Sequence, residues 1–362
     1  METALLEPAR LGGLVLPNRL VMAPMTRNRA DASGVATDLM ATYYAQRATA
    51  GLIIAEAATP NAVGQTYPNI PAIHAPAHVA GWRRVTGAVH DAGGRMFLQL
   101  QHGGRVGHPD NSGLHPVAPS PVPLPDTVHT PSGARPAVVP REMTADDVRS
   151  TVADFAAAAR NAVDAGFAGV EVHSANGYLL HQFLSRATNR RTDAYGGPAE
   201  ARIRFTAEVT RAVADAIGPD RVGVRISPGV TANAMHEDDM DEVYPALVRA
   251  LAEISPAYLH VVYADPDSAL FHTVRRIWPG TLIANPMLPD VTTEHVTRES
   301  GRLVAAGADL IALGRPFLAN PDLVERLRLG APLNPVQDQH LMYTGTATGY
   351  TDYPTMNLVM ER

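Results

Sequence analysis

The chain of 362 residues is 46% hydrophobic and 18% charged, carries a formal net charge of −6 and has a pI near 6.1. This composition is typical of a globular protein, and the mild acidity argues against nucleic acid or an anionic membrane as a partner. No apolar run approaches the roughly 20 residues that span a bilayer, and no basic segment followed by an apolar one opens the sequence. We therefore expect a soluble, cytoplasmic protein.

Two residue types are missing from the sequence. It contains no Cys and no Lys, so all 30 basic residues are Arg. Thiolate nucleophiles, iron–sulfur clusters, Schiff bases and the P-loop are therefore excluded. Neither G-x-G-x-x-G nor G-x-S-x-G occurs, so a Rossmann site and a hydrolase elbow are not indicated. The chemistry must come from His, Tyr, Arg, Asn, Asp or Glu, or from a bound cofactor.

Eight short β-type runs follow one another along the sequence, at about 19–23, 52–56, 96–100, 169–173, 222–226, 258–262, 281–284 and 310–313. Helical patterns separate most of them. Two of these patterns place apolar residues on one face, namely Val148, Val152, Phe155, Ala159 and Val163, and Met240, Val243, Leu247, Leu251 and Ile254. Thr144 and Asp147 form a typical capped start to the first. The alternation predicts one (β/α)8 TIM barrel domain spanning residues 1–362.

Residues 102–143 interrupt this alternation. They are rich in Pro and Gly and show no helical period, which would suit a linker between domains. In a barrel, however, loops that leave the C-terminal ends of strands lie over the active site, so we interpret the segment as a lid or capping loop after the third strand. Its four histidines match no standard metal-ligand spacing, and we expect no metal there.

Polar residues recur where the predicted strands end. These are Thr26, Gln99 with Gln101, the cluster from His173 to Tyr178, Arg225 with Ser227, Asn285, and Gly314 with Arg315. Each has an ordinary structural explanation as a turn or ion-pair residue. Their coincidence at the C-terminal ends of six strands predicts an active site there, with phosphate at the last two strands.

The stretch from His173 to Tyr178, HSANGY, followed by NRRTDAYGG at 189–197, resembles the old yellow enzyme family of FMN-dependent ene-reductases. NRLVMAPMTRNRA, LQLQHGGR, VGVRISP and ALGRPFLANPDL extend the resemblance along almost the whole chain, and GYTDYP is similar to the bacterial N-ethylmaleimide and nitroester reductase branch. The resemblance implies noncovalently bound FMN. On this interpretation the ring system lies beside Pro24, Met25, Thr26, Ala57, Gln99 and Arg225, and the phosphate beside Asn285, Gly314 and Arg315.

The resemblance also implies a reaction. His173 and Asn176 are expected to hydrogen-bond the carbonyl or nitro oxygen of an activated alkene, and Tyr178 to protonate the α-carbon. Thr26, Gln101 and Tyr350 are expected to complete the substrate pocket. NAD(P)H would be the hydride donor in ping-pong turnover. The expected partners are small activated alkenes, with a monomer or a homodimer as the assembly.

The sequence departs from the family pattern at three places, one of which is the mixed pair His173/Asn176 where two histidines also occur in the family. Gln101 stands where Trp is common, and Asn285–Pro286 stands where a Gly-rich phosphate turn is usual, although proline cannot donate a backbone N–H. Two other functions stay open from the sequence. One is a metal-dependent barrel hydrolase using His102, His173, His181 and acidic residues, and the other is a noncatalytic flavin-binding barrel.

Overall fold

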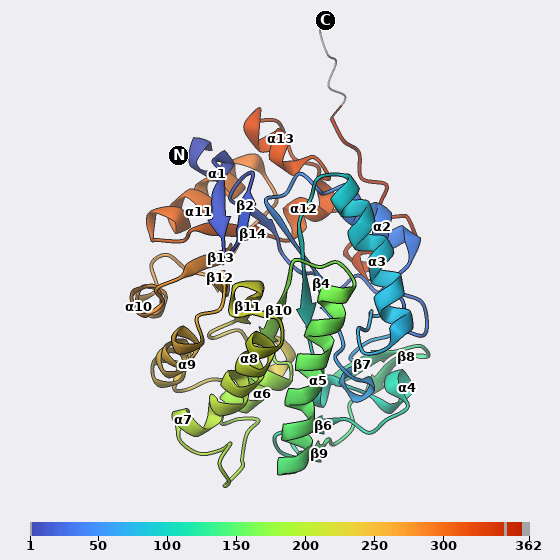
Figure 1. Cartoon of the computed structure of the whole chain (residues 1–362), viewed down its shortest axis with the longest axis vertical. Coiled ribbons are helices and arrows are strands. Elements are labelled where there is room, and N and C mark those ends of the chain that lie inside the picture. Colours follow the sequence, from blue (N-terminus) through green and yellow to red (C-terminus); the bar gives the residue numbers. More distant parts are fainter. Residues whose placement is uncertain (1, 344–345, 357–362) are drawn as a thin grey trace, which may run out of the picture.

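A computed structural model describes residues 2–343 and 346–356 (Figure 1). Eight parallel strands close into a barrel in the order β3-β4-β5-β10-β11-β12-β13-β14. Their bounds are β3 Leu20–Met22, β4 Leu52–Ala58, β5 Met96–Leu100, β10 Gly169–Ser174, β11 Val222–Ile226, β12 Tyr258–Ala264, β13 Thr281–Pro286 and β14 Leu310–Leu313. All eight overlap the β-type runs of the sequence. The (β/α)8 prediction is therefore confirmed.

Helices surround the barrel (Figure 1). The longer ones are α2 Asp38–Ala45, α3 Pro76–Asp91, α5 Ala145–Asp164, α8 Arg204–Ile217, α9 Met240–Ile254, α10 Ala269–Ile277 and α11 Thr293–Ala305. The shorter ones are α1 Glu2–Leu6, α4 Pro109–Ser112, α6 Leu179–Leu184, α7 Ala199–Arg202, α12 Arg315–Ala319 and α13 Leu323–Arg328, with 3-10 turns at η1 Ala62–Gly64, η2 Gly104–Val106, η3 Pro219–Arg221, η4 Ala232–Ala234 and η5 Gln339–Met342. Helix α5 begins at the predicted cap, where the Thr144 side chain accepts from the Asp147 N–H. None of the helices in the described ranges combines the length and the apolar character that a membrane crossing needs.

The N-terminal ends of the barrel strands, which we call the base, are covered by the hairpin of β1 Ala9–Leu11 and β2 Leu14–Leu16. Leu11 and Leu16 are buried in one apolar cluster with inward-facing strand residues such as Phe97 and Tyr258. The hairpin turn needs Gly12, which has φ +52°, and a Cβ there would lie 2.5 Å from the Asp220 carbonyl oxygen just before β11. The base is therefore sealed by apolar side chains.

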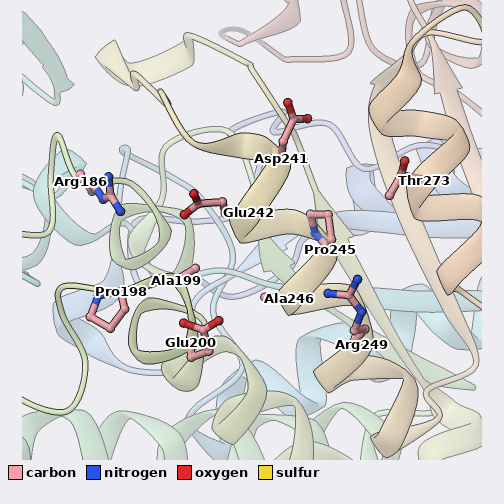
Figure 2. Close-up of a pocket in the computed structure, with 10 residues that line it drawn as sticks. All are labelled: Arg186, Pro198, Ala199, Glu200, Asp241, Glu242, Pro245, Ala246, Arg249 and Thr273. Carbon is pink, nitrogen blue, oxygen red and sulfur yellow. The ribbon is translucent and has the colours of Figure 1, made fainter.

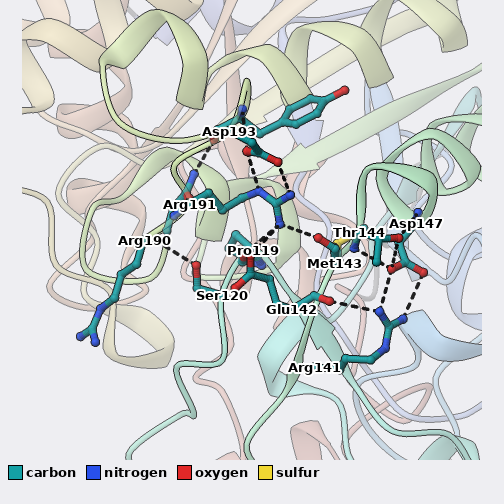
Figure 3. Close-up of polar contacts among 12 residues, drawn as sticks. Pro119, Ser120, Arg141, Glu142, Met143, Thr144, Asp147, Arg190, Arg191 and Asp193 are labelled. Atoms are coloured by element: carbon teal, nitrogen blue, oxygen red, sulfur yellow. Dashed lines mark hydrogen bonds and ion pairs between the residues drawn. The ribbon is translucent and has the colours of Figure 1, made fainter.

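Residues 102–143 contain short elements of their own. They include the antiparallel pair β7 Thr127–Thr130 and β8 Gly133–Pro136, and the parallel pair β6 Val117–Ala118 and β9 Arg141–Glu142. Figure 1 places β6 and β9 at the opposite end of the molecule from the β1–β2 hairpin. The segment is joined to the turn after α6 by the buried Arg191, which donates to the carbonyl oxygens of Pro119 and Met143 and pairs with Asp193 (Figure 3).

Candidate active site

The barrel interior changes from apolar to polar toward the C-terminal ends of the strands, which we call the mouth. Strand side chains alternate, so residues two apart share a face. Two residues before His173, Glu171 lies fully buried and accepts hydrogen bonds from Gln99 Nε2 at 2.8 Å, His260 Nδ1 at 2.8 Å and Tyr258 Oη at 3.2 Å. Burial by itself raises the pKa of Glu171, but His260, Arg225 and Gln99 together hold it below its usual value. A satisfied carboxylate therefore lies beneath the mouth.

Arg225 and Asn285 form the next polar layer on two nearby strands. Arg225 Nη2 donates to Asn285 Oδ1 at 3.2 Å, and Asn285 Nδ2 donates to the Ala312 carbonyl at 2.9 Å. Burial lowers the pKa of Arg225, partly offset by Glu171, yet a guanidinium remains charged at neutral pH. The Asn285 side chain is thus directed at its barrel neighbours, so a role for Asn285 toward phosphate would use its backbone.

His173 lies opposite Arg225 in the β10–β11 register. Burial and, as the second cause, the positive charge of Arg225 lower the pKa of His173 well below 6.5, so its imidazole is neutral at physiological pH. In the described part of the chain, His173 Nδ1 and Arg225 Nε are buried without a hydrogen-bond partner. Buried polar atoms are normally hydrogen-bonded, so these two atoms mark the mouth as a binding site for a ligand with polar atoms.

Tyr178 follows β10 on the turn that leads into α6. Its ring lies 5.1 Å from that of His173, centroid to centroid, at an interplanar angle of 68°. Burial raises the pKa of Tyr178, although its contacts with Tyr67 and Asn233 act in the opposite direction. The phenol therefore keeps its proton at neutral pH, which suits a proton donor.

Tyr67, whose hydroxyl oxygen lies 3.3 Å from that of Tyr178, is a site residue that the sequence did not indicate. It lies in the loop between β4 and α3, outside any motif. Glu171 and His260 were missed as well, although the two-residue strand period extended back from His173 would have pointed to Glu171.

The first strands bring further predicted residues to the mouth. Met25 follows β3 and lies against Gly314 at the end of β14, because a Cβ on Gly314 would be 3.2 Å from Met25 Sδ. Ala57 pairs with Gln99 in the β4–β5 register and is buried. Pro24 and Thr26 flank Met25 on the same short segment.

Three other predicted residues have their hydrogen bonds or packing partners elsewhere. Gln101 is buried and donates to Thr66 Oγ1 at 2.9 Å. Tyr350 is fully buried and stacks on Tyr43 with 4.0 Å between ring centroids. Arg315 is exposed, with Nη2 3.4 Å from the Leu288 carbonyl oxygen. The structure thus groups His173, Tyr178, Arg225, Asn285 and Gln99 more closely than these three.

A second buried carboxylate lies at the end of β4, and the sequence did not indicate it. Glu56 Oε2 accepts from the Arg27 backbone N–H at 3.1 Å, next to Thr26, and Oε1 accepts from Tyr44 Oη at 3.2 Å. Burial raises the pKa of Glu56 to about 7, against hydrogen bonds that favour its charged form. The Arg27 guanidinium in turn donates to the carbonyl oxygens of Met342 and Gly349 at 2.9 Å each. This cluster joins the mouth to the C-terminal segment.

The histidines of the hydrolase hypothesis have other partners. His102 Nδ1 accepts from the Gly104 N–H, and His181 Nδ1 accepts from the Gly177 N–H. Among the described residues, no three His, Asp or Glu side chains are placed to hold a metal ion. Burial also lowers the pKa of His102 to about 3. The geometry gives the hydrolase hypothesis no support.

An open surface pocket of about 450 Å³ lies beside the first half of α9 (Figure 2). Its lining combines acidic and basic side chains, namely Glu200, Asp241 and Glu242 with Arg186 and Arg249. None of the predicted site residues lines it. The barrel mouth, with its buried and partly unpaired polar atoms, is the better candidate for the active site.

A closed (β/α)8 barrel with converging His, Tyr and Arg side chains at the C-terminal ends of its strands defines a TIM-barrel enzyme. The chain belongs to the NADH:flavin oxidoreductase / NADH oxidase family, whose model matches residues 4–334.

Within that family, the chain is a member of the FMN-dependent old yellow enzymes. It is 42% identical over 365 residues to a probable flavin mononucleotide-dependent alkene reductase of Leishmania infantum, covering 97% of each chain. It is 39% identical to 12-oxophytodienoate reductase 1 of Oryza sativa subsp. japonica over 99% of this chain and 94% of the relative. The structure of morphinone reductase in complex with tetrahydroNAD is similar at a TM-score of 0.92, with 41% identity and 99% coverage of both chains. The old yellow enzyme homologue from Zymomonas mobilis also gives 0.92, with 38% identity over 98% of this chain and 100% of that one. The predicted family and fold are confirmed.

Proposed function

We propose that this protein uses noncovalently bound FMN and NAD(P)H to reduce the C=C bond of activated alkenes, namely enones, enals, nitroalkenes and maleimides. The observation that carries the proposal is the placement of a neutral Tyr178 beside a neutral His173 at the barrel mouth. The alkene reductase relative and the tetrahydroNAD complex of morphinone reductase support the reaction and a nicotinamide donor. Metal-dependent hydrolysis is not proposed, and a noncatalytic flavin-binding barrel stays an outcome of the test below.

The residues at the mouth fit FMN. Arg225 Nε, a buried donor without a partner in the described part of the chain, would hydrogen-bond the acceptor edge of the ring system. Pro24, Met25, Thr26, Ala57 and Gln99 would line the rings. Gly314 and Arg315, at the start of α12, would hold the phosphate together with Asn285. When bound, FMN supplies hydride chemistry that none of these side chains provides.

The chain itself binds the alkene and moves the proton. His173 and Asn176 would hydrogen-bond the carbonyl or nitro oxygen, where negative charge develops during reduction, and fixed donors act there without reorganisation. Tyr178 Oη would then donate its proton to the α-carbon. The rest of the pocket is proposed to be shaped by Thr26, Gln101 and Tyr350. The hydrogen bond from Gln101 to Thr66 would hold the Gln101 side chain in place.

We further propose that residues 102–143 form a lid within a single domain. Arg105, near the start of this segment, donates through Nη2 to the Asn233 carbonyl at 2.8 Å, and Asn233 contacts the turn that bears Tyr178. Arg191 joins the far part of the segment to the 189–197 turn (Figure 3). The segment is thus linked to the loop after β11 through Arg105 and to the turn after α6 through Arg191. Neither nucleic acid nor a membrane is proposed as a partner, and the assembly is proposed to be a monomer or a homodimer.

The proposal is tested by anaerobic titration of the purified protein with NADPH, followed by 2-cyclohexenone. We expect a yellow protein that bleaches with NADPH and regains its colour with the enone. A colourless protein contradicts FMN binding. A yellow protein that bleaches but does not recover with enones, nitroalkenes or maleimides contradicts alkene reduction and leaves the noncatalytic barrel.

A further inference from the structure

The turn that carries Asn176 and Tyr178 has a backbone conformation that few residues adopt. Asn176 has φ +55° and Gly177 has φ +78°, both in the left-handed region. A Cβ on Gly177 would lie 2.6 Å from the Ala232 carbonyl oxygen, so the turn is packed closely against the loop after β11. A backbone of this kind persists only where its surroundings fix it.

Hydrogen bonds to the four backbone groups of residues 176 and 177 provide that fixation. They are Asn176 N–H to Ser227 Oγ at 2.8 Å, Asn233 Nδ2 to Asn176 C=O at 2.7 Å, Gly177 N–H to His181 Nδ1 at 2.9 Å, and Gln182 Nε2 to Gly177 C=O at 2.8 Å. Three of these partners are uncharged amide or hydroxyl groups with one chemical state. His181 differs, because an imidazole nitrogen accepts a hydrogen bond only when it carries no proton.

The contacts of His181 decide which nitrogen is protonated. Nδ1 accepts from Gly177, so the proton must be on Nε2, which lies 3.1 Å from Glu237 Oε1 and 3.2 Å from Tyr244 Oη. Glu237 also accepts from Tyr244 Oη at 2.8 Å and from the Gly229 N–H at 3.0 Å. His181 and Tyr244 are fully buried, and the Glu237 side chain is 4% exposed. Nothing in the proposed chemistry uses this charged group.

Glu237 is held as a carboxylate. Burial raises its pKa, but the contacts from His181, Tyr244 and Gly229 bring the pKa below its usual value. An anion at this point favours the Nε2–H tautomer of His181, as carboxylates do for histidines in many sites.

We infer that Glu237 and His181 are positioning residues that act on Asn176 and Tyr178 through the backbone of Gly177. The carboxylate of Glu237 favours the tautomer of His181 that carries its proton on Nε2. In this tautomer Nδ1 can accept a hydrogen bond from the Gly177 N–H, and that hydrogen bond holds the turn in its left-handed conformation. This inference rests on the proposed function for the roles of Asn176 and Tyr178. The hydrogen-bond chain itself is independent of that function.

Substitutions at two positions separate the links of this chain. Glu237→Gln leaves one amide oxygen to accept from three donors and removes the negative charge that favours the Nε2–H tautomer of His181. His181→Asn keeps an amide oxygen near the place of Nδ1, within reach of the Gly177 N–H. His181→Gln instead places its amide near the position of Nε2. Tyr244→Phe is the control for the Tyr244 hydroxyl, which donates to Glu237 and also lies 3.2 Å from His181 Nε2. It leaves the contact between Glu237 and His181 in place.

We expect Glu237→Gln and His181→Gln to slow reduction of 2-cyclohexenone about 10- to 100-fold, since a displacement of about 1 Å at reacting groups has effects of this size. FMN content and the rate of bleaching by NADPH should change little, because the turn bears the groups for the alkene. His181→Asn should recover most of the loss seen in His181→Gln, and Tyr244→Phe should resemble the parent. Equal damage in both His181 variants, or an unaffected Glu237→Gln, overturns the inference.

The tautomer of His181 gives a second readout that needs no turnover. In protein labelled with ¹⁵N-histidine, with His181 assigned by its absence from the His181→Asn spectrum, the parent should show a protonated Nε2 and an unprotonated Nδ1. Glu237→Gln should lose this preference. An Nδ1–H tautomer in an active parent overturns the inference alone, whereas the expected tautomer in a parent that fails to reduce alkenes contradicts only the proposed function. If Glu237→Gln does not fold, the tautomer of the parent and the activities of the two His181 variants still test the inference.

Discussion

The base and the mouth of the barrel are formed by the same eight strands and differ in the side chains that these strands turn inward. Along β10, Gly169 at the base makes room for the Phe97 ring, since a Cβ there would lie 2.6 Å from it. Two residues on, Glu171 anchors the buried polar network, and two further on, His173 reaches the mouth. Within the five residues from Gly169 to His173, the inward-facing side chains of one strand thus change from packing residues to site residues. Stability and function are therefore separated along the strand axis, so substitutions at the two ends should have different effects.

The largest effect should come from the mouth. Tyr178→Phe removes only the hydroxyl that would donate the proton, so reduction of 2-cyclohexenone should slow about 10²- to 10⁴-fold. Bleaching by NADPH should stay near the parental rate, because that step needs no proton from Tyr178. Rapid-mixing experiments on each half-reaction measure the rate of bleaching by NADPH and the rate of enone reduction separately. Equal slowing of the two half-reactions would mean that Tyr178 positions the cofactor and does not act as the proton donor.

At the base, Leu16→Ala should give the opposite pattern. Leu16 is fully buried in the apolar cluster that seals the barrel, so its truncation should lower the free energy of unfolding by about 2–5 kcal/mol. Urea unfolding measures the loss. Under native conditions kcat/KM for 2-cyclohexenone should equal that of the parent. A change in kcat/KM would show that the base and the mouth are coupled.

The mouth should also make stability depend on pH in a way that the base does not. The pKa of Glu56 is about 7 in the folded protein and 4.5 for an ordinary carboxyl group. Between these values the folded protein binds more protons than the unfolded chain, so the free energy of unfolding should fall as the pH rises from 4.5 to 7, by at most about 3 kcal/mol.

Glu56→Gln should remove this contribution, because the amide does not titrate. Urea midpoints measured from pH 4.5 to 8 give the slopes. The Leu16→Ala curve serves as the control and should run parallel to the parent curve at lower stability. If Glu56→Gln and the parent have the same slope, Glu56 does not titrate in this range.

The smallest effect is expected at the edge of the mouth. Arg315 is exposed and, among the residues that the structure describes, makes one long contact, to the Leu288 carbonyl. Its proposed contact with phosphate is therefore the main interaction that Arg315→Ala would remove. FMN binding should weaken by about 1.5–3 kcal/mol, the range for charge-assisted hydrogen bonds. Flavin occupancy after dialysis measures this, with Arg315→Lys as a partial rescue. Equal occupancy in Arg315→Ala and the parent would remove Arg315 from the cofactor site.

Local patterns predicted the strands and the capped start of α5, because these depend on neighbours within a few residues. The motif from His173 to Tyr178 also lies within a few residues, so it predicted where polar groups gather. The Glu171–His260 pair escaped prediction, since it depends on the registers that join β10 through β11 to β12. Tyr67 approaches Tyr178 from a loop 111 residues away in sequence, and no periodicity encodes such a contact.

The base hairpin also escaped prediction, because two strands of three residues each give almost no pattern. Residues 102–143 lack a helical period, and their β7–β8 and β6–β9 pairs are similarly short. Tertiary packing, not local propensity, determines elements of this size.

The sealing hairpin has a consequence for the order in which the molecule assembles. Leu11 and Leu16 are synthesised before the barrel strands, but the cluster that buries them includes Tyr258, Ile283 and Leu310 from the last strands. A two-stranded hairpin is marginal in water by itself, and contacts across most of the chain form slowly. Until β14 closes the barrel, the leucines of the hairpin are exposed to solvent. Residues 9–16 are thus among the last parts to reach their native place, and chaperone dependence or aggregation during refolding should be most sensitive to them.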